Sequence, residues 1–217
     1  MASEAHPSAR RSAGAGPSRG RLGRRGVPAT GAGDPGGSSP RRPVTRISAV
    51  SLAGHVLYEL LAGVGAPFAS VLGAAPAAGL WTLGTAEVVA RARTAPRSSD
   101  GAFATANGIA LAAVVAHLVG WPRRWRRGLP WLTECEGLGP EMMPAYNAVV
   151  YAGGASALVA LATENRSAPL WRAVGPLAAV PFLVRLQHWE HRRLRAEAAR
   201  RPGWWNRRLQ PTAASRH

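Results

Sequence analysis

His55 and Glu59 are the residues whose types and spacing most directly indicate chemistry. They lie four positions apart in the apolar run ISAVSLAGHVLYELLAGVG at 47–65, with Tyr58 beside the glutamate. Residues four apart share one face of a helix, so the two side chains are expected to lie together. A charged side chain at the centre of a bilayer costs at least about 2.5 kcal/mol on insertion scales, which makes a buried acid there a functional hypothesis. A structural ion pair between the two residues is the alternative.

Three more polar residues in apolar runs extend this candidate site. Glu87 lies in the run 67–90, four residues before Arg91, and an ion pair with that arginine is its alternative role. Asn147 and Tyr151 form a polar face on the run 146–163, where hydrogen bonding between helices is the alternative. The predicted catalytic set is therefore His55, Tyr58, Glu59, Glu87, Asn147 and Tyr151.

These residue types can move protons without a cofactor. Burial favours the neutral form of a carboxylic acid, so Glu59 could act as an acid that His55 reprotonates or orients. Tyr58 and other aromatic rings could stabilise a transient cation through their faces. This chemistry suits isomerisation or cyclisation of an isoprenoid, or of another apolar lipid, within the bilayer.

The His-x-x-x-Glu pair carries a resemblance of chemistry. Together with Glu87 and Asn147, it is similar in layout to the integral-membrane sterol isomerases of the emopamil-binding kind. Fungal-type membrane terpene cyclases use related acid chemistry. The resemblance covers these few residues, and it implies an isomerase or cyclase that uses a carboxylic acid.

No motif indicates a metal or an organic cofactor. The sequence has no HExxH, DDxxD or EF-hand loop, and no GxSxG, Walker, GxGxxG or CxxC motif. His55 and Glu59 could supply two metal ligands, but a third would have to come from elsewhere in the fold. His117, in the run 101–121, is interpreted as a histidine hydrogen-bonded to a neighbouring helix. We therefore expect no metal site and no cofactor.

The candidate residues lie in five apolar stretches, at 47–65, 67–90, 101–121, 146–163 and 169–189. Each is close to the roughly 20 residues that a helix needs to cross about 30 Å of hydrocarbon. The sequence therefore predicts an all-α, polytopic helical membrane bundle of four or five transmembrane segments. The stretch at 67–90 is the weakest, and Pro76, Pro176 and Pro181 are expected to kink or interrupt their helices.

Three regions are expected along the chain. Residues 1–46 are rich in Arg, Gly, Ser and Pro and are predicted to be a disordered tail. Residues 47–190 form the predicted transmembrane domain, and residues 191–217 a basic cytoplasmic tail. Arginines in both tails could bind anionic lipid headgroups.

Charge and cysteine content exclude other classes of protein. The formal net charge is +16 and all 27 basic residues are arginines, a bias typical of a GC-rich bacterial genome. The arginines lie in the tails and in short loops beside apolar runs, as in membrane proteins, so no nucleic-acid partner is expected. A single cysteine, Cys135, excludes a disulfide within the chain.

Topology is left with two solutions. If all five stretches cross, the termini lie on opposite sides of the membrane. If the stretch at 67–90 does not cross, both tails and the loop PRRWRR at 122–127 lie together, as the positive-inside rule favours. Apolar length favours five crossings, and five crossings would leave one of the arginine-rich tails outside. We expect a multi-pass protein of the cell membrane with four or five spans and a cytoplasmic C-terminus.

Two other functions explain the same residues. In a small transporter or proton-relay protein, the polar faces would line a path across the membrane. In a non-catalytic accessory protein, the arginine-rich tails would hold partners or anionic lipid. In that case changes at His55 and Glu59 would alter stability and no chemistry. An enzyme remains the first hypothesis.

Overall fold

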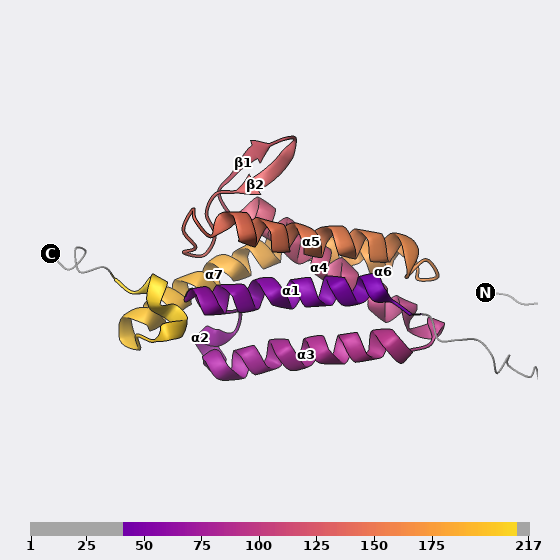
Figure 1. Ribbon diagram of the computed structural model, residues 1–217, viewed down its shortest axis with the longest axis horizontal. Helices are drawn as coiled ribbons and strands as arrows, with labels where there is room; N and C mark the ends of the chain where they lie inside the picture. The colour runs from indigo at the N-terminus through magenta and orange to yellow at the C-terminus, as the bar shows by residue number, and fades with distance from the viewer. Residues whose placement is uncertain (1–40, 212–217) are drawn as a thin grey trace, which may run out of the picture. The chain divides into compact units, whose positions relative to one another are not determined.

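The computed structural model describes residues 41–211, and it is mostly helical (Figure 1). The all-α prediction is therefore confirmed. Five long helices are joined by short elements and by one antiparallel β-hairpin. The elements are α1 (Pro43–Ala62), α2 (Ala69–Leu72), α3 (Ala74–Thr94), η1 (Arg97–Ser99), α4 (Asp100–Gly120), β1 (Arg123–Arg126), β2 (Leu129–Leu132), α5 (Met143–Thr163), α6 (Leu170–Val174), η2 (Gly175–Ala179), α7 (Val180–Arg200) and η3 (Trp204–Leu209).

The long helices run in alternating directions, with α1 at the centre. α1 packs most extensively against α5 and also against α3 and α4, while α4 packs against α5 and α7. At one end of the bundle the backbone N–H of Arg42 donates to the carbonyl of Ala92, at the end of α3. At the other end the Tyr58 hydroxyl donates to the carbonyl of Met142, just before α5. α1 begins at one end of the bundle, and α7 ends at the other end (Figure 1).

Prolines and glycines set where the second and fifth apolar stretches break. Gly73, with φ 88°, separates α2 from α3, and Pro76 lies in the first turn of α3, where no N–H is needed. Pro176 lies in the 3-10 helix η2, and Pro181 in the first turn of α7. The predicted interruption of the fifth stretch is confirmed, because α6, η2 and α7 share it.

Two helical segments of the described chain are long and apolar enough to cross a membrane: Arg97–Gly120 and Met143–Thr163. They correspond to the third and fourth predicted stretches. The prediction of four or five spans is thus supported for two. The first stretch carries His55 and Glu59, the helix of the second ends with Arg91 and Arg93, and the fifth is divided at η2.

The folded bundle has other boundaries than those expected for the transmembrane domain. α1 begins at Pro43, so residues 43–46 of the predicted tail are its first turn, while residues 1–40 lie outside the described part. α7 continues to Arg200, and η3 then brings Leu209, which is 7% exposed, into the hydrophobic core. Residues 191–209 are therefore part of the folded bundle.

A buried ion pair fixes the start of α1. Arg42 is 0% exposed, and its guanidinium donates to Asp100 at 2.7 Å and to the carbonyls of Ala95 and Pro96 at 2.8 Å. The same guanidinium lies 4.5 Å from the centre of the Phe103 ring. These contacts join α1 to the turn between α3 and α4.

A second acid caps α1 itself. The Glu164 carboxylate, at the end of α5, accepts from the backbone N–H groups of Val44 and Thr45 at 2.7 and 2.8 Å, and from the Thr45 hydroxyl. A negative charge is favoured at a helix N-terminus, where these N–H groups have no partner within the helix. α1 therefore takes its cap from α5.

Gly108 allows the close approach of α4 to α6 and η2. A Cβ at this position would collide with the carbonyl oxygen of Ala173 and lie 3.0 Å from Cγ of Pro176. Gly108→Ala is expected to destabilise the bundle by about 1–3 kcal/mol, the usual cost of overpacking. Gly79→Ala is the control, because that position in α3 has nothing within 4 Å. Apparent Tm in detergent measures both, and equal values for the two variants would contradict the prediction.

Candidate functional site

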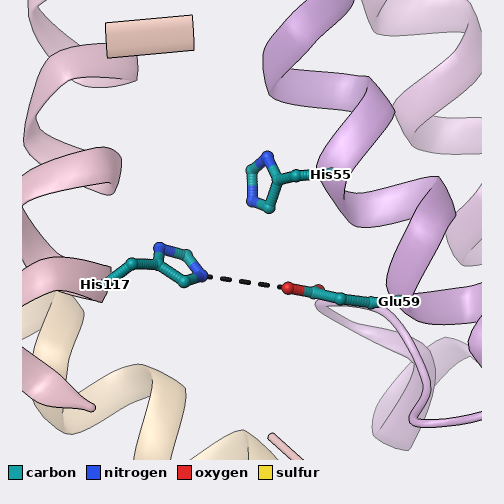
Figure 2. Close-up of side chains that lie close together, drawn as sticks. All are labelled: His55, Glu59 and His117. Carbon is teal, nitrogen blue, oxygen red and sulfur yellow. Dashed lines mark ion pairs between the residues drawn. The ribbon is translucent and has the colours of Figure 1, made fainter. Parts of the chain in front are cut away.

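Three buried side chains converge between α1 and α4 (Figure 2). His55 and Glu59 point from α1 toward His117 on α4, and the ligand-type atoms of all three lie within 4.8 Å of one another. The distance from Glu59 Oε1 to His117 Nε2 is 3.9 Å, and the two imidazole rings are 5.2 Å apart, nearly perpendicular. Exposed fractions are 7%, 1% and 6%, so water has little access. We call these residues the His–Glu triad.

Tyr146 on α5 joins the triad through its hydroxyl group. This hydroxyl donates a hydrogen bond to Glu59 Oε1 and accepts one from the Cys135 thiol at 3.5 Å. Its ring centre lies 6.3 Å from that of His55 and 6.2 Å from that of His117. Glu59 therefore contacts groups from α4 and α5, far from it in the sequence.

Small residues bring the three helices close enough for this convergence. A Cβ on Gly153 of α5 would lie 3.5 Å from Cβ of Ser51 on α1, and one on Gly154 would lie 3.1 Å from Cγ1 of Val114 on α4. Helices packed through such residues approach closely along their backbones. The side chains of one turn of each helix can then meet in a shared interior.

Each histidine is oriented by backbone of its own helix. His117 Nδ1 lies 2.8 Å from the carbonyl oxygen of Ala113, one turn earlier, so this nitrogen carries the proton and donates it. His55 makes backbone hydrogen bonds with Ser51 and Leu52, also one turn earlier. In neutral His117 the other nitrogen, Nε2, then presents a lone pair to Glu59.

The loop before α5 adds a second acid beside the triad. His117, Cys135 and Glu136 also have ligand-type atoms within 4.8 Å of one another. Glu136 has φ 50°, a strained backbone for a non-glycine residue. Burial, followed by the facing Glu190 carboxylate, raises the pKa of Glu136 to about 8. At neutral pH this side chain therefore holds a proton to a large extent.

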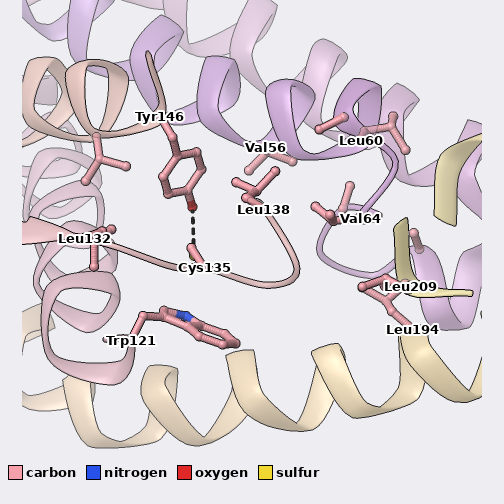
Figure 3. Close-up of a cluster of buried hydrophobic side chains, with 14 of the residues drawn as sticks. Val56, Leu60, Val64, Trp121, Leu132, Cys135, Leu138, Tyr146, Leu194 and Leu209 are labelled. Atoms are coloured by element: carbon pink, nitrogen blue, oxygen red, sulfur yellow. Dashed lines mark hydrogen bonds between the residues drawn. The ribbon is translucent and has the colours of Figure 1, made fainter. Parts of the chain in front are cut away.

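Hydrophobic side chains enclose the site on the side of the loop (Figure 3). Tyr146, Cys135 and Leu132 form one wall, and Trp121 lies below them against α7. The Trp121 ring contacts the rings of His188 and His191, at 4.7 and 5.5 Å between centres. This packing separates the triad from the charged surface of α7.

An apolar cavity of about 310 Å³ lies between α1, α3 and α4. Its lining includes Leu52 on α1, Trp81 on α3 and Ala110 on α4, with few polar groups. His55 follows Leu52 by three residues, and His117 follows Ala110 by seven. At 1.5 Å per residue these positions are about 4.5 and 10.5 Å further along their helices. The residues that line the cavity on α1 and α4 thus come before the triad on the same helices, and the triad residues themselves do not line it.

The structure brings together two of the six predicted catalytic residues. His55 and Glu59 meet, and Tyr58 lies at the margin, its ring centre 6.0 Å from that of Tyr146 and its hydroxyl bound to Met142. Glu87 is exposed on α3 and pairs with Arg91, which is the alternative role given for it.

Asn147 and Tyr151, on α5, bind the β-hairpin and not the triad. The Asn147 amide accepts from the N–H of Leu132 at 3.0 Å and donates to the carbonyls of Leu132 and Met143 at 2.9 and 2.8 Å. The Tyr151 hydroxyl donates to the carbonyl of Pro130, and its ring stacks on Trp131. Both residues hold the hairpin against α5.

Sequence reasoning left four residues of the site outside the predicted set: His117, Cys135, Glu136 and Tyr146. His117 could have been included from the sequence, because it is the one histidine of a long apolar stretch that has no charged residue after Asp100. Cys135 and Glu136 had no such signal, since they lie in an irregular loop whose path is fixed only by tertiary contacts.

Comparison with known proteins adds no assignment. No known protein family matches the chain. No curated protein and no solved structure matches it either. Functional inference therefore depends on the geometry described above.

Proposed function

We propose that this protein is a membrane-embedded acid/base enzyme, an isomerase or cyclase, whose substrate is an isoprenoid or another apolar lipid. The observation that carries the proposal is the convergence of Glu59, His117 and Tyr146, with His55, in one buried site. Burying titratable groups from three helices together costs free energy. Their convergence therefore indicates a function.

The distribution of charge supports placement in a bilayer. From residue 47 to residue 86 the one formally charged side chain is Glu59, and residues 101–121 and 142–163 have none. Large apolar side chains are exposed on the outer faces of several helices, among them Ile47, Leu83, Ile109, Leu158 and Phe182. Surfaces of this kind are suited to lipid.

The proposed topology has five crossings in the cell membrane, formed by α1, α3, α4, α5 and the α6–α7 segment. Alternating helix directions support this count. Arginines of the β-hairpin, α7 and η3 gather at the end of the bundle where α1 ends, and we place that end and the C-terminus in the cytoplasm. The same arginines are suited to anionic lipid headgroups.

The apolar cavity is the proposed binding site for the hydrocarbon chain of the substrate. Its lining from α1, α3 and α4 offers apolar contact along the chain, and it lies before the triad on α1 and α4. A lipid could enter sideways from the bilayer past α3, which packs mainly on α1 and α2. The reactive double bond or epoxide would then lie beside Glu59.

Proton transfer is assigned to Glu59, with its neighbours in supporting roles. His117 Nε2, 3.9 Å from Oε1 of Glu59, presents a lone pair and is the base that can accept a proton beside the acid. The Tyr146 hydroxyl donates to the Glu59 carboxylate and holds it in place, and the Cys135 thiol in turn donates to that hydroxyl. Aromatic rings of Tyr58 and Tyr146 can stabilise a transient cation.

The experiment compares apolar extracts of cells that carry the wild-type gene, the Glu59→Gln gene or a deletion. Isoprenoids and lipids are quantified by mass spectrometry. We expect one species to accumulate equally in the Glu59→Gln and deletion strains, because the amide cannot transfer the proton. Glu141→Gln is the matched control, since Glu141 is exposed and pairs with Arg208, and it should match wild type.

The result counts only if membrane fractions contain equal amounts of each protein. Identical extracts from the wild-type, Glu59→Gln and deletion strains would refute the enzyme and favour an accessory protein or a transporter. A species that changes in the deletion but not in Glu59→Gln would remove Glu59 from the chemistry.

A further inference from the structure

We infer that the His–Glu triad binds a divalent transition metal ion, zinc(II) or iron(II), through His55, Glu59 and His117. The inference goes beyond the proposed function, because it does not depend on lipid chemistry; while an ion is bound, Glu59 is an ionised ligand and not the proton donor. His117 on α4 is the third ligand, which the sequence alone did not identify for His55 and Glu59.

The composition of the triad matches that of catalytic metal sites. Two imidazoles and one carboxylate are the three protein ligands of many catalytic zinc sites, in which a fourth position stays open for water or substrate. The same set forms the facial triad of non-haem iron(II) enzymes. The ligand-type atoms lie within 4.8 Å of one another, a separation that a central ion with bonds of about 2.0–2.2 Å can bridge with small side-chain movements.

The arrangement around the histidines is that of metal ligands. A metal-bound histidine usually donates its second ring N–H to a backbone carbonyl or a carboxylate, which fixes the ring and raises its basicity. His117 does this with Ala113 at 2.8 Å. The His55 ring lies beside backbone of Ser51 and Leu52, one turn earlier. The His117 ring is thus held before any ion binds.

Glu59 also has the surroundings of a ligand. Among the described residues its side chain pairs with no arginine, and its contacts are the Tyr146 hydroxyl and His117. An isolated buried carboxylate is costly, and a divalent cation would offset that cost more strongly than a hydroxyl group. Tyr146 then acts as the partner that orients the ligating carboxylate.

Buried polar atoms without a hydrogen-bond partner lie on the side of His117, where they are available to water molecules or ligands. Within the described residues, four buried side-chain nitrogen or oxygen atoms have no hydrogen-bond partner. Three of these belong to Trp121, Gln187 and His191, at the same end of α4 as His117. Water molecules or ligands that accompany an ion would satisfy such atoms.

Cys135 and Glu136 define the competing arrangement. His117 has one nitrogen free for a metal, so the group His117–Cys135–Glu136 and the His–Glu triad cannot each hold a separate ion through it. We assign the ion to the triad because its ligands lie on two packed helices, which position side chains more rigidly than the loop does. A Cys135→Ser variant separates the two arrangements.

The test measures metal in the full chain, purified in detergent without oxygen. Elemental analysis of the wild type should give about one zinc or iron per chain. After removal of the metal by a chelator, zinc(II) and iron(II) are added back separately and their affinities compared. Glu59→Gln and His117→Gln should each weaken binding at least tenfold, whereas Cys135→Ser and the control Glu141→Gln should bind like wild type.

Cobalt(II) provides a second readout that does not depend on the variants folding. Visible absorption of the cobalt-loaded wild type should report nitrogen and oxygen ligands and no sulfur-to-cobalt charge-transfer band. Wild-type protein that arrives without metal and binds neither zinc nor iron would overturn the inference. A sulfur band, or loss of metal in Cys135→Ser alone, would also overturn it, in favour of the loop ligands.

The two proposals fail separately. A chain that binds metal but changes no lipid on deletion refutes the enzyme and leaves the metal site. A metal-free chain whose Glu59→Gln variant accumulates a lipid refutes the metal site and leaves the enzyme.

Discussion

Arg42→Ala is expected to destabilise the bundle by about 3–5 kcal/mol, the range for removing one partner of a buried ion pair. The substitution removes the guanidinium from the Asp100 carboxylate, which is 5% exposed. The Ser167 hydroxyl, which already donates to this carboxylate, stays as its partner. The substitution also removes the hydrogen bonds to the carbonyls of Ala95 and Pro96. For a chain of this size the loss corresponds to a decrease in Tm of about 6–20 °C.

Arg41→Ala is the matched control, because Arg41 is exposed and precedes the buried arginine. Apparent Tm in detergent is measured for both variants and for Arg42→Met combined with Asp100→Leu. The double variant should recover much of the loss, since no unpaired charge stays buried. Equal Tm values for Arg41→Ala and Arg42→Ala would show that the ion pair does not stabilise the fold.

Asn147→Ala is expected to be the second large effect, and to act on structure alone. It leaves the N–H and the carbonyl of Leu132, a residue that is 0% exposed, without their side-chain partner. Each unsatisfied buried group costs about 1–3 kcal/mol. The β-hairpin should therefore loosen from α5, with a lower Tm and faster proteolysis between residues 122 and 133.

Tyr151→Phe is the comparison for Asn147→Ala, because it removes one hydrogen bond between a partly buried residue of α5 and the same hairpin, at Pro130. Its effect should be about 1 kcal/mol or less. Limited proteolysis and apparent Tm are read together with the lipid extracts. If Asn147→Ala kept wild-type stability but its lipid extract matched that of the deletion strain, Asn147 would have a role in the reaction.

The helices could largely be predicted from the sequence, because apolar length is a local property. The stretches at 101–121 and 146–163 correspond closely to α4 and α5, and Pro176 correctly predicted the break in the fifth stretch. Arg42 shows where such reasoning stops. It lies among Gly, Ser, Pro and Arg residues that predict a disordered tail, yet Asp100, 58 positions away, makes it one of the most buried side chains.

The candidate site was likewise predictable where it depends on local spacing and not where it depends on tertiary contacts. His55 and Glu59 were predictable because four-residue spacing on a helix is local, and Glu59 is the lone charge of a long apolar region. Asn147 and Tyr151 have the same spacing, but their partners are the carbonyl groups of a hairpin that composition does not reveal. His117 and Tyr146 could not be matched to Glu59, because the rotation of one helix against another is set by packing.

The central place of α1 has a consequence for biosynthesis. α1 leaves the ribosome first, whereas Tyr146 and His117, which contact Glu59, follow it by 87 and 58 residues. Until they arrive, the helix holds an acid with no partner beyond its own turn, at a penalty of about 2.5–3.5 kcal/mol for insertion alone. We therefore expect α1 to stay at the translocon, or at the membrane surface, until α4 and α5 enter the bilayer beside it.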